Sequence, residues 1–173
     1  MALALLSLAW MEPRAARAQS SPLELAVKAT YLYKLAPFVE WPPNAYADPA
    51  APLVLCVQGD DAFSALVERA VAGQKVDAHP IEVRRSSKLE VQTGCHIAYV
   101  GGSQAQTAAA ALQALHGSPV LTVTDEARAA KGVVNFRRDQ GKVRFDIDKV
   151  EADQSKLVVS SKLLSLAVHV RTR

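Results

Sequence analysis

The sequence lacks the features that mark membrane spans, zinc sites and nucleic-acid surfaces. Its longest apolar stretch, residues 2–10, is too short to cross a bilayer. It has two cysteines and four histidines, and their spacing includes no C-x-x-C or H-x-x-x-H pair, so we predict no metal site. The net charge of +3 comes from scattered Lys and Arg residues without interleaved aromatics. This pattern argues against nucleic acid as a partner.

Motifs that carry catalysis or bind cofactors are also missing. Neither G-x-G-x-x-G nor G-x-x-x-x-G-K-[ST] occurs, so a dinucleotide or P-loop phosphate site has no support. Ser160 and Ser161 lie in no G-x-S-x-G or S-x-x-K motif, and a helix cap explains their hydroxyls better than a nucleophile does. Asp60, Asp61 and Asp125 lie at predicted strand ends, as magnesium ligands do in phosphotransfer receivers, but such a site also needs a lysine after a later strand, and the hairpin around Gly141 takes the place of that strand. We therefore predict a protein that is not an enzyme and has no cofactor.

The N-terminus has the pattern of an export signal. The apolar residues 2–10 are followed by a polar segment in which Ala16 and Ala18 stand at the two positions that a signal peptidase reads. We expect residues 1–18 to form a signal peptide, cleavage after Ala18, and a periplasmic location without membrane insertion of the mature protein. The alternative is a short N-terminal helix of a cytosolic protein.

The rest of the chain, residues 23–173, alternates strand and helix patterns and is expected to form one α/β domain. Continuous apolar runs that end in glycine or aspartate predict buried parallel strands, and apolar residues at helical spacing predict the helices between them. The expected helices cover 23–39, 62–72, 104–115 and 160–170, with a short helical turn through 130. The expected strands cover 53–57, 81–85, 96–100, 120–124, 133–137 and 142–147.

This order of elements predicts a three-layer α/β sandwich with a mixed, mostly parallel sheet. The last two strands flank 138–141, whose glycine suits a tight turn, so they form a C-terminal antiparallel hairpin that is followed by a helix.

Ligands of such sheets bind at the carboxyl ends of the strands. Gly59, Asp60, Gly101, Gly102 and Asp125 are predicted to lie there and are candidate ligand-binding residues. The simpler alternative is that these glycines only make tight turns and that Asp60 or Asp61 caps a helix.

Two surfaces are candidates for binding a partner protein. The first is the corner after the first helix, where Phe38 and Trp41 place aromatic side chains beside two prolines. A rival surface is the exposed face of the hairpin, with Arg144 and Asp146. Trp41 is equally explained as a core residue.

The two cysteines, Cys56 and Cys95, form an even count, which favours a disulfide in an oxidising compartment. Two separate buried thiols are the alternative.

Several segments in order resemble the YfiR-like family of bacterial periplasmic proteins. The resemblance covers residues 25–170 and rests on KATYLY at 28–33, FVEWP at 38–42, CHIAYV at 95–100, VLTVTD at 120–125, GVVNF at 132–136 and SSKLLSLA at 160–167.

The resemblance implies a periplasmic regulator that binds the sensory domain of an inner-membrane diguanylate cyclase and represses it, which lowers cyclic-di-GMP and biofilm formation. It also implies a homodimer with redox sensitivity, in which Cys56 and Cys95 correspond to a family disulfide. A second cysteine pair of some members is absent from this sequence. A periplasmic small-ligand-binding module without a cyclase partner is the alternative function.

Overall fold

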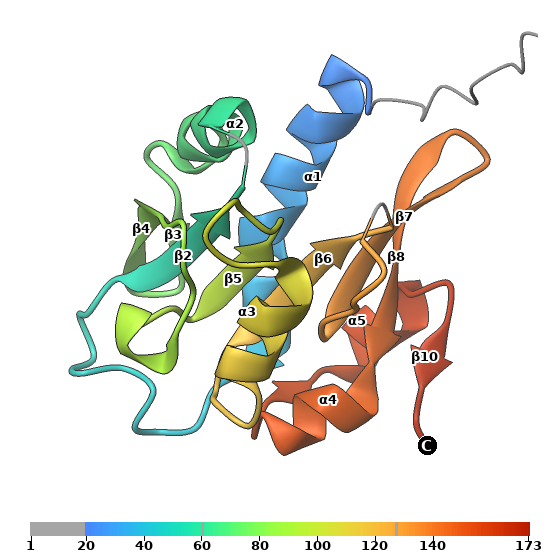
Figure 1. Cartoon of the computed structure of the whole chain (residues 1–173). Coiled ribbons are helices and arrows are strands. Elements are labelled where there is room, and N and C mark those ends of the chain that lie inside the picture. The colour runs from blue at the N-terminus through green and yellow to red at the C-terminus, as the bar shows by residue number, and fades with distance from the viewer. Residues whose placement is uncertain (1–19, 60, 127) are drawn as a thin grey trace, which may run out of the picture.

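The computed structural model describes residues 20–59, 61–126 and 128–173 (Figure 1). The helices are α1 (Pro22–Lys34), α2 (Asp61–Val71), α3 (Ala108–Leu115), α4 (Lys149–Gln154) and α5 (Ser161–Leu166), with 3-10 turns at Ala36–Phe38 and Val91–Thr93. The strands are β1 (Val39–Glu40), β2 (Leu53–Gln58), β3 (Lys75–Val76), β4 (His79–Arg85), β5 (Ile97–Val100), β6 (Leu121–Asp125), β7 (Val134–Asp139), β8 (Lys142–Asp148), β9 (Val158–Val159) and β10 (Val170–Arg171). No helix in these ranges is long and apolar enough to cross a membrane.

The main sheet has eight strands in the order β10-β8-β7-β6-β5-β2-β4-β3. The five strands from β4 to β7 run parallel to one another, while β8 is antiparallel to β7 and β3 is antiparallel to β4. The predicted mixed, mostly parallel sheet with a C-terminal hairpin is therefore confirmed. A separate short ladder pairs β1 with β9.

Side chains that alternate along the strands build two hydrophobic layers, one on each face of the sheet. On β2, Leu55 and Val57 pack in the cluster that contains α1 and α2, while Val54 and Cys56 pack in the cluster that contains α3. Figure 1 shows α1 and α3 on opposite faces of the sheet. The predicted three-layer sandwich is confirmed.

The first helix is shorter than the predicted 23–39. Ser21 caps its start by accepting a hydrogen bond from the Glu24 amide at 3.2 Å. The helix ends at Lys34, because Pro37 has no amide hydrogen to continue the α-helical hydrogen bonds, and a 3-10 turn over Ala36–Phe38 follows. Val39 and Glu40 then form β1 instead of continuing the helix.

Two other predicted helical segments differ in the structure. The helix predicted at 104–115 begins only at Ala108, because Ser103 accepts backbone hydrogen bonds from Ala105 and Gln106 and holds the preceding residues in a turn. Thr107 then caps α3 through the Ala110 amide. The helical turn predicted through 130 is absent from the described residues 128–130, which form bends and irregular structure.

The C-terminal region has more elements than the single helix predicted at 160–170. Ser160 caps α5, which ends at Leu166 because Ala167 is extended, and Val170 and Arg171 pair with β8 as a strand. The short helix α4, capped by Asp148, was not predicted. The hairpin matches the prediction, and both Gln140 and the predicted Gly141 have positive φ at its turn.

Candidate functional site

Three of the predicted ligand residues, Gly59, Gly101 and Gly102, lie together at the carboxyl ends of β2 and β5. A Cβ atom on Gly59 would lie 3.4 Å from the carbonyl oxygen of Gly102. One on Gly101 would lie 2.3 Å from the carbonyl oxygen of Gln58. The two backbones therefore pack directly against each other, and glycine is required at Gly101 by this close approach.

Glutamine side chains fill the space between these strand ends. Gln58 is fully buried, and its Nε2 atom donates to Oε1 of Gln106 at 2.8 Å. Its own Oε1 atom accepts from the Gly102 amide at 3.1 Å, and Gln106 also bonds both backbone groups of Leu89. These glutamines were missed at the sequence level, where only their position at a strand end and in a turn marks them. The ligand prediction for Gly59, Gly101 and Gly102 stays a prediction, at a place that this chain's own side chains occupy.

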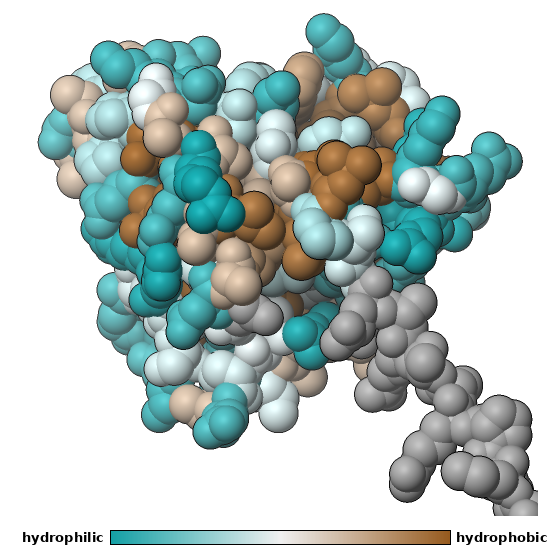
Figure 2. Space-filling model, turned by 90° about the horizontal axis from the view of Figure 1, so that it is seen from above, coloured by the Kyte–Doolittle hydropathy of each residue, from teal (hydrophilic) through white to brown (hydrophobic). Residues whose placement is uncertain are grey.

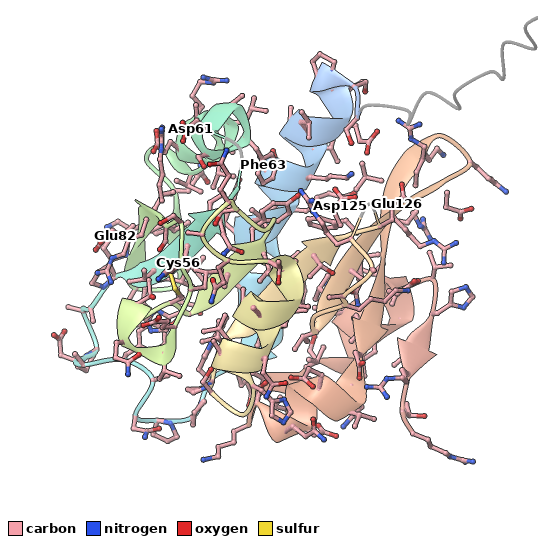
Figure 3. The ribbon with its side chains drawn as sticks, viewed as in Figure 1. Cys56, Asp61, Phe63, Glu82, Asp125 and Glu126 are labelled. Carbon is pink, nitrogen blue, oxygen red and sulfur yellow. A yellow bond between two sulfur atoms is a disulfide. The ribbon has the colours of Figure 1, made fainter. Side chains whose placement is uncertain are left out.

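Asp125 ends β6, which pairs directly with β5, the strand that leads into Gly101 and Gly102, whereas β5 separates it from β2 and Gly59. Its Oδ2 atom is 2.6 Å from Nζ of Lys28, which is buried and also contacts Oε1 of Glu24 at 2.5 Å. Figure 3 shows Asp61 on α2, well away from Asp125. Asp60 lies outside the described residues. Within those residues no cluster of three or more His, Cys, Asp or Glu has the arrangement that a metal ion needs.

A buried charge network surrounds Lys28. Burial raises the pKa of Glu24, but hydrogen bonds from Lys28 and Arg138 outweigh it and lower the pKa from 4.5 to about 2. Burial lowers the pKa of Lys28, yet its bonds to Asp125 and Glu24 outweigh burial and raise it. Glu24 and Lys28 are therefore both charged at neutral pH, and their ion pairs link α1 to β6 and to the end of β7.

Trp41 belongs to an aromatic cluster that holds the loop 41–52 on the sheet. Its Nε1 atom donates to the carbonyl oxygen of His96 at 3.3 Å, and its ring meets Tyr46 edge-on. Tyr46 is stacked between His79 and His96, with ring centroids 4.1 and 4.2 Å away. Trp41 is thus engaged by its own chain, which agrees with the alternative interpretation as a packing residue.

His96 is fixed in one neutral form within this cluster. Its Nδ1 atom accepts from the Val54 amide at 3.0 Å, so its Nε2 atom carries the proton and donates to the Ala45 carbonyl at 3.0 Å. Burial lowers the pKa of His96, as do the nearby His79 and Arg84. The residue therefore serves the packing of the loop.

Phe38 and Arg144, which were predicted on rival surfaces, line the same groove. This groove has a volume of about 240 Å³ and lies between the end of α1, β8 and α5. Its walls are mostly apolar, and the side chains that the sequence analysis did not single out include Tyr31, Leu35, Val143, Leu163 and Leu166. Leu166 is 52% exposed and lies in this apolar lining.

A second hollow of about 460 Å³ continues the groove toward the start of α1 and the turn of the hairpin. Both hollows are lined by Tyr31, Val143 and Arg144, so we call them together the α1–β8 groove. Figure 2 shows hydrophobic side chains at the surface where the chain enters α1, next to the hydrophilic tip of the hairpin. Asp146 does not line the groove, and its carboxylate accepts from Arg137 at 3.3 Å.

Cys56 and Cys95 form a disulfide. Cys56 lies in β2 and Cys95 just before β5, with their Cα atoms 5.7 Å apart, and both are buried in the layer that contains α3. Figure 3 shows the sulfur of Cys56 within the sheet, remote from Asp125. The bond therefore fastens two neighbouring strands.

Comparison with protein families identifies the family to which the chain is similar. The family described as YfiR/HmsC-like matches residues 25–168, most of the chain. No curated protein matches it significantly. The matched range contains the disulfide, the charge network except Glu24, and most of the residues that line the α1–β8 groove.

Proposed function

The chain belongs to the YfiR/HmsC-like family, and from this membership we propose that it is a periplasmic protein that represses an inner-membrane diguanylate cyclase. It binds the periplasmic sensory domain of the cyclase, holds the enzyme inactive, and so lowers cyclic-di-GMP and biofilm formation. The observation that carries the proposal is the family match over residues 25–168, because this family is known for periplasmic regulation of such cyclases. The chain itself acts by binding and not by catalysis.

The disulfide supports the proposed location. Cys56 and Cys95 are paired, and structural disulfides persist in oxidising compartments such as the bacterial periplasm. Residues 1–18, the proposed signal peptide, lie outside the described residues. Mass spectrometry of the protein from a periplasmic extract should give Gln19 as the first residue and no free thiol. Retention of Met1 with two free thiols would contradict export.

We propose the α1–β8 groove as the surface that meets the cyclase. Its support is an apolar lining with exposed Leu166 and the presence of two predicted partner residues, Phe38 and Arg144. The other two, Trp41 and Asp146, are engaged within the chain and are less suitable anchors. We also propose a homodimer, as the family resemblance implies.

Co-expression tests the function directly. The full chain should be produced with each membrane diguanylate cyclase that has a periplasmic domain, and cellular cyclic-di-GMP measured by mass spectrometry. We expect a fall with at least one cyclase. The matched control lacks residues 2–18, stays in the cytosol and should leave the level unchanged. If no cyclase responds to the exported protein, the proposed repression is wrong.

The alternative of a periplasmic small-ligand module at the strand ends has less support. Gln58 and Gln106 occupy the space beside Gly101 and Gly102, so a ligand would have to displace them. A thermal-shift screen of small metabolites would favour this alternative if one of them raised the melting temperature and a Gln58→Ala substitution abolished the rise.

A further inference from the structure

Strand β8 is paired on both sides along only part of its length. On one side it pairs with β7 from Lys142 to Ile147. On the other side its partner β10 pairs only with Ile147 and Asp148. Within the described residues, the beginning of β8 therefore forms a free edge of the main sheet.

The free edge exposes backbone groups at Val143. The Phe145 carbonyl accepts from the Val168 amide, and the Ile147 amide donates to the His169 carbonyl, both at 2.9 Å and both away from β7. Because the backbone groups of alternate residues in a strand point to the same side, the amide and carbonyl of Val143 also point away from β7. Among the described residues no partner meets them there.

The α1–β8 groove runs beside this edge. Val143 and Phe145 point toward α1 and line the groove with Tyr31 and Phe38. On the side of α5, the groove is bordered by the exposed Leu166. A strand added next to Val143 would therefore place every second side chain against an apolar wall.

Three basic residues lie near the free edge of β8 and the groove beside it. Lys142 and Arg144 alternate with Val143 along β8, so their side chains leave the strand on its other face while both residues still border the groove at the sheet edge, and Lys34 also lines the groove. All three side chains are exposed, and none makes an ion pair within the described residues. The one acid that lines the groove, Glu24, is already bound by Lys28 and Arg138.

We propose that β8 binds a partner protein by strand addition, and that the added segment alternates apolar with acidic residues. Its backbone pairs with Val143, its apolar side chains enter the α1–β8 groove, and its acidic side chains meet Lys142 and Arg144. That this partner is a cyclase sensory domain rests on the proposed function; the chemistry of the added segment does not.

A second copy of this chain is a poor occupant of the edge. Two β8 strands paired edge to edge would bring Lys142 and Arg144 of both copies onto one small surface, where like charges repel. Charge complementarity instead favours an acidic segment from another protein.

The binding test uses two labelled ten-residue peptides, one alternating valine with glutamate and one alternating valine with lysine. Fluorescence anisotropy with the full mature chain should show binding of the glutamate peptide only. Val143→Pro removes the outward amide without touching the ladder to β7, and should weaken binding by about tenfold or more. Its matched control, Val143→Thr, keeps the amide and the branched shape and should bind nearly as the wild type does.

Two charge-reversal variants test the same proposal if the Val143→Pro variant does not fold. Arg144→Glu should also weaken binding of the glutamate peptide, whereas Lys75→Glu, the same charge change on β3 at the far edge of the sheet, should not. Equal binding of both peptides, or equal loss in the Arg144 and Lys75 variants, would overturn the proposal.

Hydrogen exchange at the Val143 amide separates strand pairing from unspecific attraction between charges, because only pairing protects this amide. The Val143 amide should exchange fast in the free protein and slowly with the glutamate peptide. Slow exchange in the free protein, together with a dimer that Val143→Pro converts to monomer, would identify a second copy as the occupant and overturn the proposal.

In cells, Val143→Pro should relieve repression of the cyclase. If the wild type represses no cyclase while the peptide results hold, the proposed function fails and the strand addition stands.

Discussion

The Nζ atom of Lys28 lies 2.6 Å from the Oδ2 atom of Asp125, and the Lys28 side chain is only 1% exposed. The two residues come from α1 and from the end of β6, which are 97 positions apart in the chain. Glu24 supplies a second carboxylate to the same ammonium group, and Arg138 binds the other oxygen of Glu24. One wall of the α1–β8 groove is therefore held to the sheet by buried charges as well as by apolar packing.

Removing the ammonium group should destabilise the fold strongly. Lys28→Met leaves Glu24 and Asp125 buried without their cation, and breaking one side of a buried ion pair costs about 3–5 kcal/mol. Urea denaturation followed by circular dichroism measures this loss. Lys149→Met is the matched control, because its ion pair with Asp153 is exposed and its removal should change the free energy of unfolding by less than about 0.5 kcal/mol.

The same network predicts a loss of stability in acid. The pKa of Glu24 is about 2 in the folded chain against 4.5 for the ordinary side chain, so the unfolded chain takes up this proton first as the pH falls. The contribution of Glu24 is complete above about pH 4.5 and disappears as the pH falls from there to about 2. Melting temperatures between pH 6 and pH 2.5 should fall less in Glu24→Gln than in the wild type. Exposed Glu40 provides the control, and Glu40→Gln should follow the wild-type curve.

Burial of His96 should cause a second loss of stability, at a milder pH than the loss caused by Glu24. Burial holds the pKa of His96 below 6.5, so the unfolded chain binds a proton near pH 6.5 while the folded chain does not. The free energy of unfolding should therefore fall as the pH drops below about 6.5, and stop falling below the pKa of the folded state. Urea denaturation at pH 7.5 and 5.5 measures the difference, which should shrink in His96→Gln. If His169→Gln, a change of an exposed histidine, shrank it equally, His96 would not be the cause.

The sheet and its layers follow from short-range patterns. The strand β2 reads as an apolar run that ends in glycine, and the turn of the hairpin is marked by Gly141, so both were predicted within two residues of their observed bounds. The helix α4 has six residues, too few to show a helical period, and only its cap, Asp148, signals it. The pairings of β1 with β9 and of β10 with β8 join distant pairs of residues, which no local pattern reports.

The candidate site shows the same limit. Phe38 and Arg144 were each singled out by residue type, but their meeting in one groove depends on how α1 crosses β8. From the local sequence, Lys28 looks like a surface lysine on a helix. Only the tertiary contact with Asp125 of β6 shows that it is buried in an ion pair. Gln58 carries no motif, and its burial follows from the close approach of Gly101 and Gly102. Tertiary contacts, not local preferences, decide these roles.

A methyl group at Gly101 should disturb the junction of β2 and β5. Its Cβ atom would lie 2.3 Å from the Gln58 carbonyl oxygen and 3.3 Å from the Tyr99 ring, so backbone must move. We expect Gly101→Ala to lower the free energy of unfolding by more than about 2 kcal/mol. At Gly73, no atom lies within 4 Å of the added Cβ atom, and only the positive φ disfavours alanine. Gly73→Ala should therefore lower the free energy of unfolding by only about 1 kcal/mol. Equal costs would show that the junction is looser than its packing indicates.

The disulfide should stabilise the fold by restricting the unfolded chain. Cys56 and Cys95 are 39 positions apart, and closing a loop of that length is worth about 4 kcal/mol in the chain-entropy account. Dithiothreitol should therefore lower the melting temperature of the wild type and leave a Cys56→Ser, Cys95→Ser double variant unchanged. Both sulfurs are buried in the layer of α3 and lie far from Asp125, whose ion pair with Lys28 holds α1, one wall of the groove, to the sheet. At temperatures where the reduced protein is still folded, it should therefore keep its α1–β8 groove. Binding of the alternating valine–glutamate peptide below the melting temperature should then be the same with and without reductant. A loss of binding in the folded, reduced protein would instead couple this bond to the groove and make the disulfide a switch.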